Sequence, residues 1–140
     1  MKFSSKTRYG LRVLLHIALE SKDNKTCNGR EISSCQGLND AYFEQIMLRL
    51  KNSGLIRTVR GRNGGYALAK KANFISLLDI IESLEGPFDL GDDQVGDSRE
   101  AQAAAKVFDL LSDSFREELS AITLESIIQQ ELKQAPDYII

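Results

Sequence analysis

A helical segment and a glycine-rich turn between residues 39 and 66 carry the side chains of this chain that are best suited to recognition chemistry. The amide of Gln45 can pair with adenine, the carboxylate of Glu44 can accept from the N4 amino group of cytosine, and Arg49 can bind guanine or phosphate. The turn at residues 60–66 adds two guanidinium groups, which can reach phosphates or a narrow minor groove. This order of residue types predicts a recognition helix followed by a basic wing, and hence a DNA-binding regulator.

A helix over residues 40–52 must position Glu44, Gln45 and Arg49. Its apolar residues recur at helical spacing and form a core stripe of Phe43, Ile46, Met47 and Leu50. At about 100° per residue, Ala41 and Gln45 point directly away from this stripe, and Ala41 is small enough to let the helix approach a groove or touch a thymine methyl group. Glu44 and Arg49 lie on the flanks. The residues of this helix that we expect to contact DNA, with an ordinary solvated surface as the alternative for each, are Asn39 (also the expected N-cap), Ala41, Tyr42, Glu44, Gln45 and Arg49.

A hairpin wing over residues 55–69 must present the two guanidinium groups of the turn. Residues 55–59 are predicted to form a strand rich in β-branched side chains, residues 60–65 a turn, and residues 66–68 the returning strand. The glycines of the turn permit positive backbone dihedrals and close approach to a ligand. Because the turn joins two strands and lacks the Lys-Ser/Thr ending of a P-loop, binding of a nucleotide phosphate is the less favoured alternative. The wing residues expected to contact DNA are Arg60, Arg62, Asn63 and Gly64.

Charge is divided unevenly between the two halves of the chain, although the net charge of all 140 residues is only −2. Residues 1–71 hold 14 Lys/Arg and 5 Asp/Glu, whereas residues 72–140 hold 4 and 15. The amino-terminal half is therefore suited to meet phosphate and the other half is not. No apolar run approaches the roughly 18 residues that span a bilayer, and no signal-peptide core is present, so we expect a cytoplasmic protein without a membrane partner.

The fold predicted from these patterns is mainly α with a small β-wing. We divide it into a winged helix-turn-helix DNA-binding domain, an acidic loop, a dimerisation helix, and a C-terminal helix with a tail, at residues 1–86, 87–100, 101–122 and 123–140. Other helices are expected over residues 7–20, 29–36, 74–85 and 98–121, and a last helix, capped by Thr123, is expected to fold back onto the amino-terminal domain.

The helix expected over residues 98–121 carries a continuous apolar stripe. At about 1.5 Å per residue it is roughly 30 Å or more long, which is too long to be buried against so small a domain. We therefore expect it to pack against its copy in a homodimer. A two-fold pair would place the recognition helices about 34 Å apart, which matches a palindromic operator in double-stranded DNA.

An enzyme is the alternative of a different class, and the residues argue against it. The one histidine, His16, lies among apolar neighbours on the first helix. It is accompanied by no nucleophile and base pairing and by no metal-ligand spacing. We expect neither catalysis nor a bound cofactor or metal.

Several motifs together resemble the Rrf2 family of winged-helix repressors, and the resemblance spans nearly the whole chain. The most specific are the Tyr-x-Glu-Gln helix at residues 42–45 and the Arg-Gly-x-x-Gly-Gly-Tyr wing at residues 60–66. The others are Ser5-Lys6-Thr7-Arg8-Tyr9-Gly10-Leu11, Gly54-Leu55-Ile56, Asp79-Ile80-Ile81 and Leu84-Glu85-Gly86-Pro87. The resemblance implies a dimeric transcription factor whose 42–45 region reads the major groove while Arg60 enters the minor groove.

The chain departs from the IscR branch of that family, whose members ligate an iron–sulfur cluster with three Cys and a His. The corresponding stretch, residues 88–105, holds five acidic residues and neither Cys nor His. An acidic loop is expected there, with a carboxylate site for a hard cation as the weaker alternative. Without a cluster the chain resembles the CymR branch, which regulates cysteine metabolism. A regulator of iron–sulfur or redox genes with another signal is the alternative.

The carboxyl-terminal peptide agrees with the CymR branch, whose members also end in an aromatic-containing peptide with a terminal Ile. Serine acetyltransferases use a similar terminus to occupy the active site of O-acetylserine sulfhydrylase. Capture of a C-terminal carboxylate is a known recognition mode, although a frayed end is the usual fate of a terminus. An adaptor that binds that enzyme without reading DNA is a further hypothesis. The candidate partner-binding residues are Tyr138, Ile139 and Ile140.

Cys27 is the second feature that agrees with this branch. It lies in the polar loop ahead of the DNA-reading helices, at about the place where CymR-like proteins can carry a lone thiol. An exposed thiol near Lys25 is a candidate redox site, because oxidation there would alter DNA binding. A passive thiol is the more common case for a loop cysteine.

Overall fold

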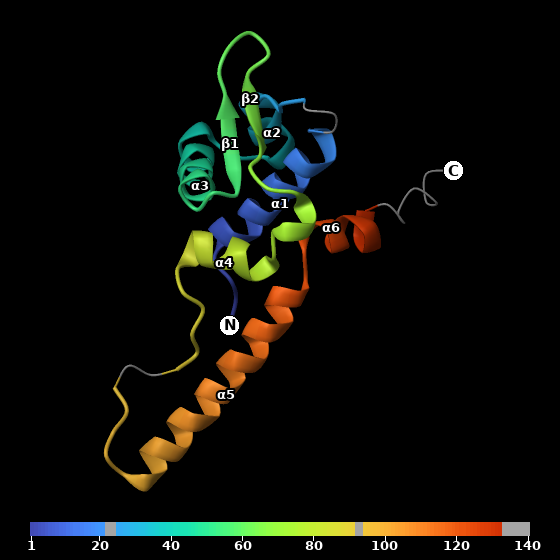
Figure 1. Cartoon of the computed structure of the whole chain (residues 1–140). Helices are drawn as coiled ribbons and strands as arrows, with labels where there is room; N and C mark the ends of the chain where they lie inside the picture. The colour runs from blue at the N-terminus through green and yellow to red at the C-terminus, as the bar shows by residue number, and fades with distance from the viewer. Residues whose placement is uncertain (22–24, 92–93, 133–140) are drawn as a thin grey trace.

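The computed structural model describes residues 1–21, 25–91 and 94–132 of the 140-residue chain. Helices α1 to α4 and the hairpin form one body, and α5 extends away from it (Figure 1). The fold is mainly α with one small antiparallel sheet, as the sequence predicts. The elements in chain order are α1 (Ser5–Glu20), α2 (Gly29–Gln36), α3 (Asp40–Asn52), β1 (Ile56–Val59), β2 (Gly65–Leu68), η2 (Ala72–Phe74), α4 (Leu77–Glu85), α5 (Arg99–Ala121), α6 (Leu124–Ile127) and η3 (Ile128–Leu132).

The longer helices begin where a polar side chain accepts a hydrogen bond from a backbone N–H of the first turn. These N-caps of α1 to α5 are Ser4, Asn28, Asn39, Ser76 and Ser98. The helix expected over residues 74–85 begins later, at Leu77, because Ser76 and Asp79 form a reciprocal capping box. The residues before it form the separate 3₁₀ turn η2. Apolar periodicity predicted the start too early, since it does not locate a cap.

Helix α1 lies at the centre of the hydrophobic core. It packs against α2, α3, α4, β2 and α6, and its Val13, Leu14 and Ile17 side chains are fully buried. Each such side chain contributes roughly 1.5–3 kcal/mol by leaving water. Gly10 permits α4 to approach closely, because a Cβ at that position would collide with the Leu84 side chain.

The last helix folds back onto the amino-terminal domain, as predicted. Leu124 and Ile128 are 0% and 4% exposed and belong to the main core. Only four residues are α-helical, and η3 continues them as a π-helical turn. The backbone beside α6 is bonded to the start of α4, because the Leu77 N–H donates to the Ile122 carbonyl at 2.8 Å and the Leu124 N–H donates to the Ile75 carbonyl at 2.9 Å.

Besides the backbone bonds that follow its last residue, polar side-chain contacts attach α5 to α4 and to the loop after α4. Arg116 Nη1 donates to Glu82 Oε2 at 2.9 Å and to the Phe88 carbonyl at 3.1 Å. The backbone N–H of Phe88 and the Arg116 guanidinium hold the pKa of Glu82 below its ordinary value of 4.5, despite partial burial. The Leu90 N–H also donates to Ser112 Oγ at 2.7 Å. The chain leaving α4 is therefore held against the carboxyl-terminal half of α5.

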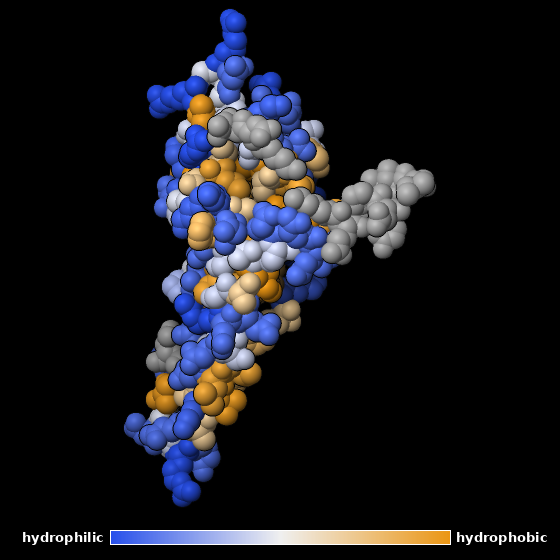
Figure 2. All heavy atoms as spheres, turned by 45° about the vertical axis from the view of Figure 1, so that its right-hand side comes forward, coloured by the Kyte–Doolittle hydropathy of each residue, from blue (hydrophilic) through white to orange (hydrophobic). Residues whose placement is uncertain are grey.

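Most of α5 is not covered by its own domain. Its exposed large apolar side chains range from 42% exposed at Leu111 to 59% at Leu110, and the others are Val107, Phe108 and Phe115. Figure 2 shows apolar side chains gathered toward the end of the molecule that α5 forms. The expectation that this helix is too long to be buried by its own domain is confirmed. Within the described residues, no helix combines the length and the apolar character needed to span a membrane.

Candidate nucleic-acid interface

Helices α2 and α3 form the helix-turn-helix unit. Gly37 ends α2 with a φ of 69°, the left-handed conformation that favours glycine. Asn39 then caps α3 by accepting a hydrogen bond from the Tyr42 N–H at 2.8 Å. The predicted core stripe of α3 is confirmed, because its members are at most 3% exposed: Phe43, Ile46, Met47 and Leu50. The opposite face of α3 is turned to solvent.

The solvent-facing strip of α3 holds Ala41, Glu44 and Gln45, all of them exposed. It also holds Leu48, which is 59% exposed and which the sequence reasoning overlooked. The helical angle is the signal that finds it, because seven residues beyond Ala41 is nearly two full turns of about 3.6 residues. The strip therefore combines two groups that form hydrogen bonds with two that present only carbon.

Tyr42 and Arg49 contact the neighbouring helices. The Tyr42 and Ser5 hydroxyls lie 2.6 Å apart, and the Tyr42 ring meets the Tyr9 ring edge-on at 6.2 Å between centroids. Arg49 Nη1 donates to the Leu84 carbonyl at the end of α4, at 3.4 Å, where a cation is favourable. These contacts orient α3 against α1 and α4. The contacts of both residues with DNA stay predictions.

Strand β1 of the β1–β2 hairpin lies beside α3, and the wing tip extends beyond the helices (Figure 1). The strands pair antiparallel with Val59 opposite Gly65, and across the tip the Gly64 N–H donates to the Gly61 carbonyl at 3.0 Å. A Cβ at Gly64 would collide with the Val59 carbonyl oxygen, so only glycine fits there without a shift of the backbone. The side chains exposed at the tip are Arg60, Arg62 and Asn63.

The segment before α2 pairs with β2 and holds the wing in place. The Cys27 N–H donates to the Tyr66 carbonyl and the Tyr66 N–H to the Cys27 carbonyl, both at 2.8 Å. Thr26 Oγ1 donates to the Asn63 carbonyl at 2.7 Å. The Tyr66 ring meets Phe43 of α3 edge-on, with 6.0 Å between centroids. Wing and recognition helix are thus fixed relative to each other by contacts that the sequence did not predict, because they join distant parts of the chain.

Cys27 is buried, so the prediction of an exposed thiol was wrong. Its side chain is 4% exposed, and Sγ lies 3.9 Å from the Ile17 carbonyl. Burial, with the charges of Glu20 and Glu31, raises the pKa of the Cys27 thiol above its ordinary value of 9.0. Because the thiolate is the reactive form, this environment disfavours oxidation. The exposed cysteine is Cys35.

The two cysteines are expected to differ in reactivity. In the folded protein at neutral pH, iodoacetamide should alkylate Cys35 at least about tenfold faster than Cys27, because a buried thiol reacts only after local opening. Mass spectrometry of peptides from timed samples gives the two rates. In guanidinium chloride both cysteines should react alike. Equal rates in the folded protein would restore Cys27 as a candidate redox residue.

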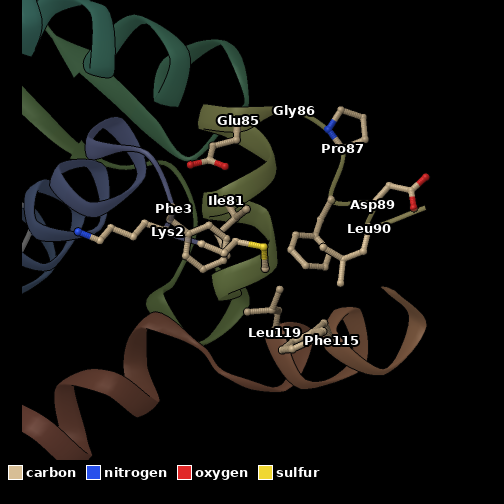
Figure 3. A pocket seen from close by; sticks show the side chains of 12 residues that line it. Lys2, Phe3, Ile81, Glu85, Gly86, Pro87, Asp89, Leu90, Phe115 and Leu119 are labelled. Atoms are coloured by element: carbon tan, nitrogen blue, oxygen red, sulfur yellow. The ribbon is translucent and has the colours of Figure 1, made fainter. Parts of the chain in front are cut away.

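A cavity of about 460 Å³ lies where the amino-terminal segment, α4, the loop after α4, and α5 meet (Figure 3). Phe3, Ile81, Phe115 and Leu119 give it an apolar lining, with the Glu85 carboxylate at its edge. Phe115 is 47% exposed, so the lining continues into the exposed apolar strip of α5. The cavity belongs to the junction between the helix-turn-helix body and α5, away from α3 and the wing (Figure 1).

Comparison with known proteins places this arrangement in a family. The model of the Rrf2 family, described as an iron-dependent transcriptional regulator, matches residues 3–130. The chain belongs to the Rrf2 family of transcriptional regulators. It is therefore a regulator of the winged-helix DNA-binding class and not an enzyme, as the sequence predicts.

Individual Rrf2 relatives support this assignment. The HTH-type transcriptional regulator CymR of Bacillus subtilis is 33% identical over 127 residues, which cover 91% of this chain and 89% of CymR. The regulator IscR of Pectobacterium atrosepticum is 33% identical over 131 residues, covering 91% and 79%. The structure of CymR, the global cysteine regulator of B. subtilis, matches with a TM-score of 0.77 at 30% identity over 92% of this chain and 97% of that chain. The structure of T. potens IscR matches with a TM-score of 0.75 at 28% identity over 99% and 96%.

Proposed function

We propose that this Rrf2-family regulator reads an operator with the outward strip of α3 in the major groove and Arg60 of the wing in the adjacent minor groove. The observation that carries the proposal is that Glu44 and Gln45 are exposed on α3, which packs against β1 of the hairpin, while Arg60 and Arg62 are exposed at the tip of the same hairpin. The contacts of Tyr66 with α3 and with the segment before α2 fix the spacing of helix and wing. The excess of Lys and Arg over residues 1–71 complements the phosphate backbone.

We further propose that the regulator is a homodimer joined through α5. Exposed apolar patches of this extent mark interaction surfaces, and the five side chains on α5 are each 42–59% exposed in the single chain. A two-fold pair of these helices would bury the strip and cover the mouth of the cavity at Phe115. It would also set the two α3 helices about 34 Å apart, on successive major grooves of a palindromic operator.

We infer that the regulated genes belong to cysteine and sulfur metabolism and that the regulator represses them. The supporting observations are the similarity to CymR and the composition of residues 88–105, which offer neither thiolate nor imidazole to an iron–sulfur cluster. Iron dependence, named in the description of the family, is therefore not carried over to this chain. The IscR relatives favour the alternative, in which iron–sulfur or redox genes respond to another signal.

A protein partner, O-acetylserine sulfhydrylase, is proposed for the C-terminal residues Tyr138, Ile139 and Ile140, which lie outside the described residues. The purified regulator is expected to co-elute with that enzyme, and deletion of Ile140 is expected to abolish the association, because the peptide would present its terminal carboxylate to the amino-acid site. Size-exclusion chromatography of the mixtures is the measurement. Failure of the intact protein to bind would remove this partner and leave the reading of DNA untouched.

Replacement of Arg60 by alanine tests the docking of the wing. We expect operator affinity to fall by about 1 to 3 kcal/mol, because a guanidinium in the narrow minor groove gains from the strong negative potential there. The dependence of affinity on salt should also become shallower by about one unit of slope. Fluorescence anisotropy across a salt series measures both quantities.

The matched control for Arg60→Ala is Arg99→Ala, which removes the same charge from an exposed position at the start of α5. It should leave affinity and salt slope close to those of the unaltered protein. Equal behaviour of the two variants would contradict the proposed wing docking. If the unaltered protein showed no operator preference at any salt concentration, the adaptor hypothesis would replace the reading of DNA.

A further inference from the structure

One apolar side chain on the recognition helix is turned to solvent. Leu48 is 59% exposed, whereas the core residues of α3 are at most 3% exposed: Phe43, Ile46, Met47 and Leu50. Over residues 5–68, within the part that the structure describes, it is the only large hydrophobic side chain in the exposed class. A lone surface leucine is common in proteins and by itself means little. Its position on α3 is what points to a role in recognition.

The helical geometry places Leu48 on the strip that faces DNA in the proposed docking. At about 100° per residue it lies roughly 20° from Ala41 and roughly 60° from Gln45 around the helix axis. Along the axis it lies about 4.5 Å beyond Gln45, and long side chains on a helix lean toward its amino-terminal end. The branched end of Leu48 is therefore directed toward the part of the groove that Gln45 reaches.

The chemistry of leucine restricts what it can recognise there. Its side chain neither donates nor accepts a hydrogen bond, so it gains nothing from base N and O atoms. The apolar feature of the major groove is the C5 methyl group of thymine. We propose that Leu48 packs against one thymine methyl in each half-site and thereby selects a thymine at that position. This inference rests on the proposed docking of α3.

Deoxyuridine, which lacks only that methyl group, provides the test. An operator is first selected from a random DNA library with the intact protein, and each thymine is then replaced singly by deoxyuridine. At one thymine per half-site, replacement should lower the affinity of the unaltered protein by about fourfold. This loss corresponds to the free energy gained by burying one methyl group. Leu48→Ala should bind the selected operator more weakly and show no further loss at that position. Leu48→Met should retain the sensitivity.

The outcomes separate this inference from the proposed function. Selection of no DNA sequence by the intact protein would overturn both. A selected operator whose affinity is unaffected by every deoxyuridine would overturn the contact with Leu48 alone. So would an equal deoxyuridine loss in Leu48→Ala. Because Leu48 is exposed, the alanine variant should keep its melting temperature, which is measured alongside.

Discussion

Leu111→Asp is expected to convert the proposed homodimer into monomers and to lower operator affinity by at least about 100-fold. Leu111 is 42% exposed in the single chain, near the middle of the apolar strip on α5. In a two-fold pair the substituted carboxylate would be buried against its own copy, which is strongly unfavourable for two like charges. Loss of the pair removes the gain that comes from binding two half-sites at once, typically 10²- to 10⁴-fold.

Light scattering coupled to size-exclusion chromatography, together with operator titration, measures both effects of Leu111→Asp. The matched control is Gln102→Asp, which adds the same charge on the opposite side of α5 at an exposed position. The control should remain dimeric and bind normally. Because Leu111 is partly exposed, the monomer should fold, with an unchanged helical circular dichroism spectrum. A dimeric Leu111→Asp protein that binds its operator would show that α5 is not the interface.

Gly64→Ala is expected to lower operator affinity by about 10- to 100-fold through the shape of the wing alone. The new Cβ would collide with the Val59 carbonyl oxygen and lie 2.9 Å from the Gly61 carbonyl oxygen. The backbone of the tip must shift to relieve this contact, which displaces Arg60 and Arg62 together. Each misplaced contact to DNA costs about 1 to 3 kcal/mol. Melting temperature should change little, because the core residues on α1, α3 and α4 are not touched.

Gly96→Ala serves as the control for Gly64→Ala. Gly96 lies before α5, where a Cβ would approach the Ala101 side chain at 3.2 Å and no main-chain atom of the wing. That variant should bind the operator as the unaltered protein does. Operator titrations of both variants at one salt concentration give the comparison. If Gly64→Ala bound normally, the conformation of the tip would be irrelevant to recognition, and the wing docking would have to be abandoned.

The elements of the reading surface were accessible from the sequence because local rules determine them. The N-cap at Asn39 and the buried stripe of α3 follow from residue type and spacing within one helix, and the structure has both. The strands of the wing agree to within one residue at each end, since the glycines and β-branched residues fix them. The face of α3 presented to solvent was predicted in the same way.

Contacts between distant segments could not be predicted from the sequence. Cys27 is buried because its backbone pairs with Tyr66, and Arg49 is bound to the carbonyl of Leu84 at the far end of α4. Neither partner is signalled by spacing. Leu48 is a different case, because the helical angle already places it on the outward strip with Ala41, so it could have been predicted from the sequence. The contacts of the reading residues with DNA remain predictions for the experiments above.

The attachment of α5 at two places has a consequence for the choice of operator. Backbone pairing beside α6 holds the carboxyl-terminal end of the helix, and the ion pair between Glu82 and Arg116 holds it less than two turns earlier. Because α5 is held at two points, it cannot rotate freely about either one. Its orientation relative to α3 is therefore determined when the chain folds. In a two-fold assembly the two α3 helices would then be held at a fixed spacing. A site whose halves are displaced by one base pair, about 3.4 Å, would have to be accommodated by twisting or bending of the duplex.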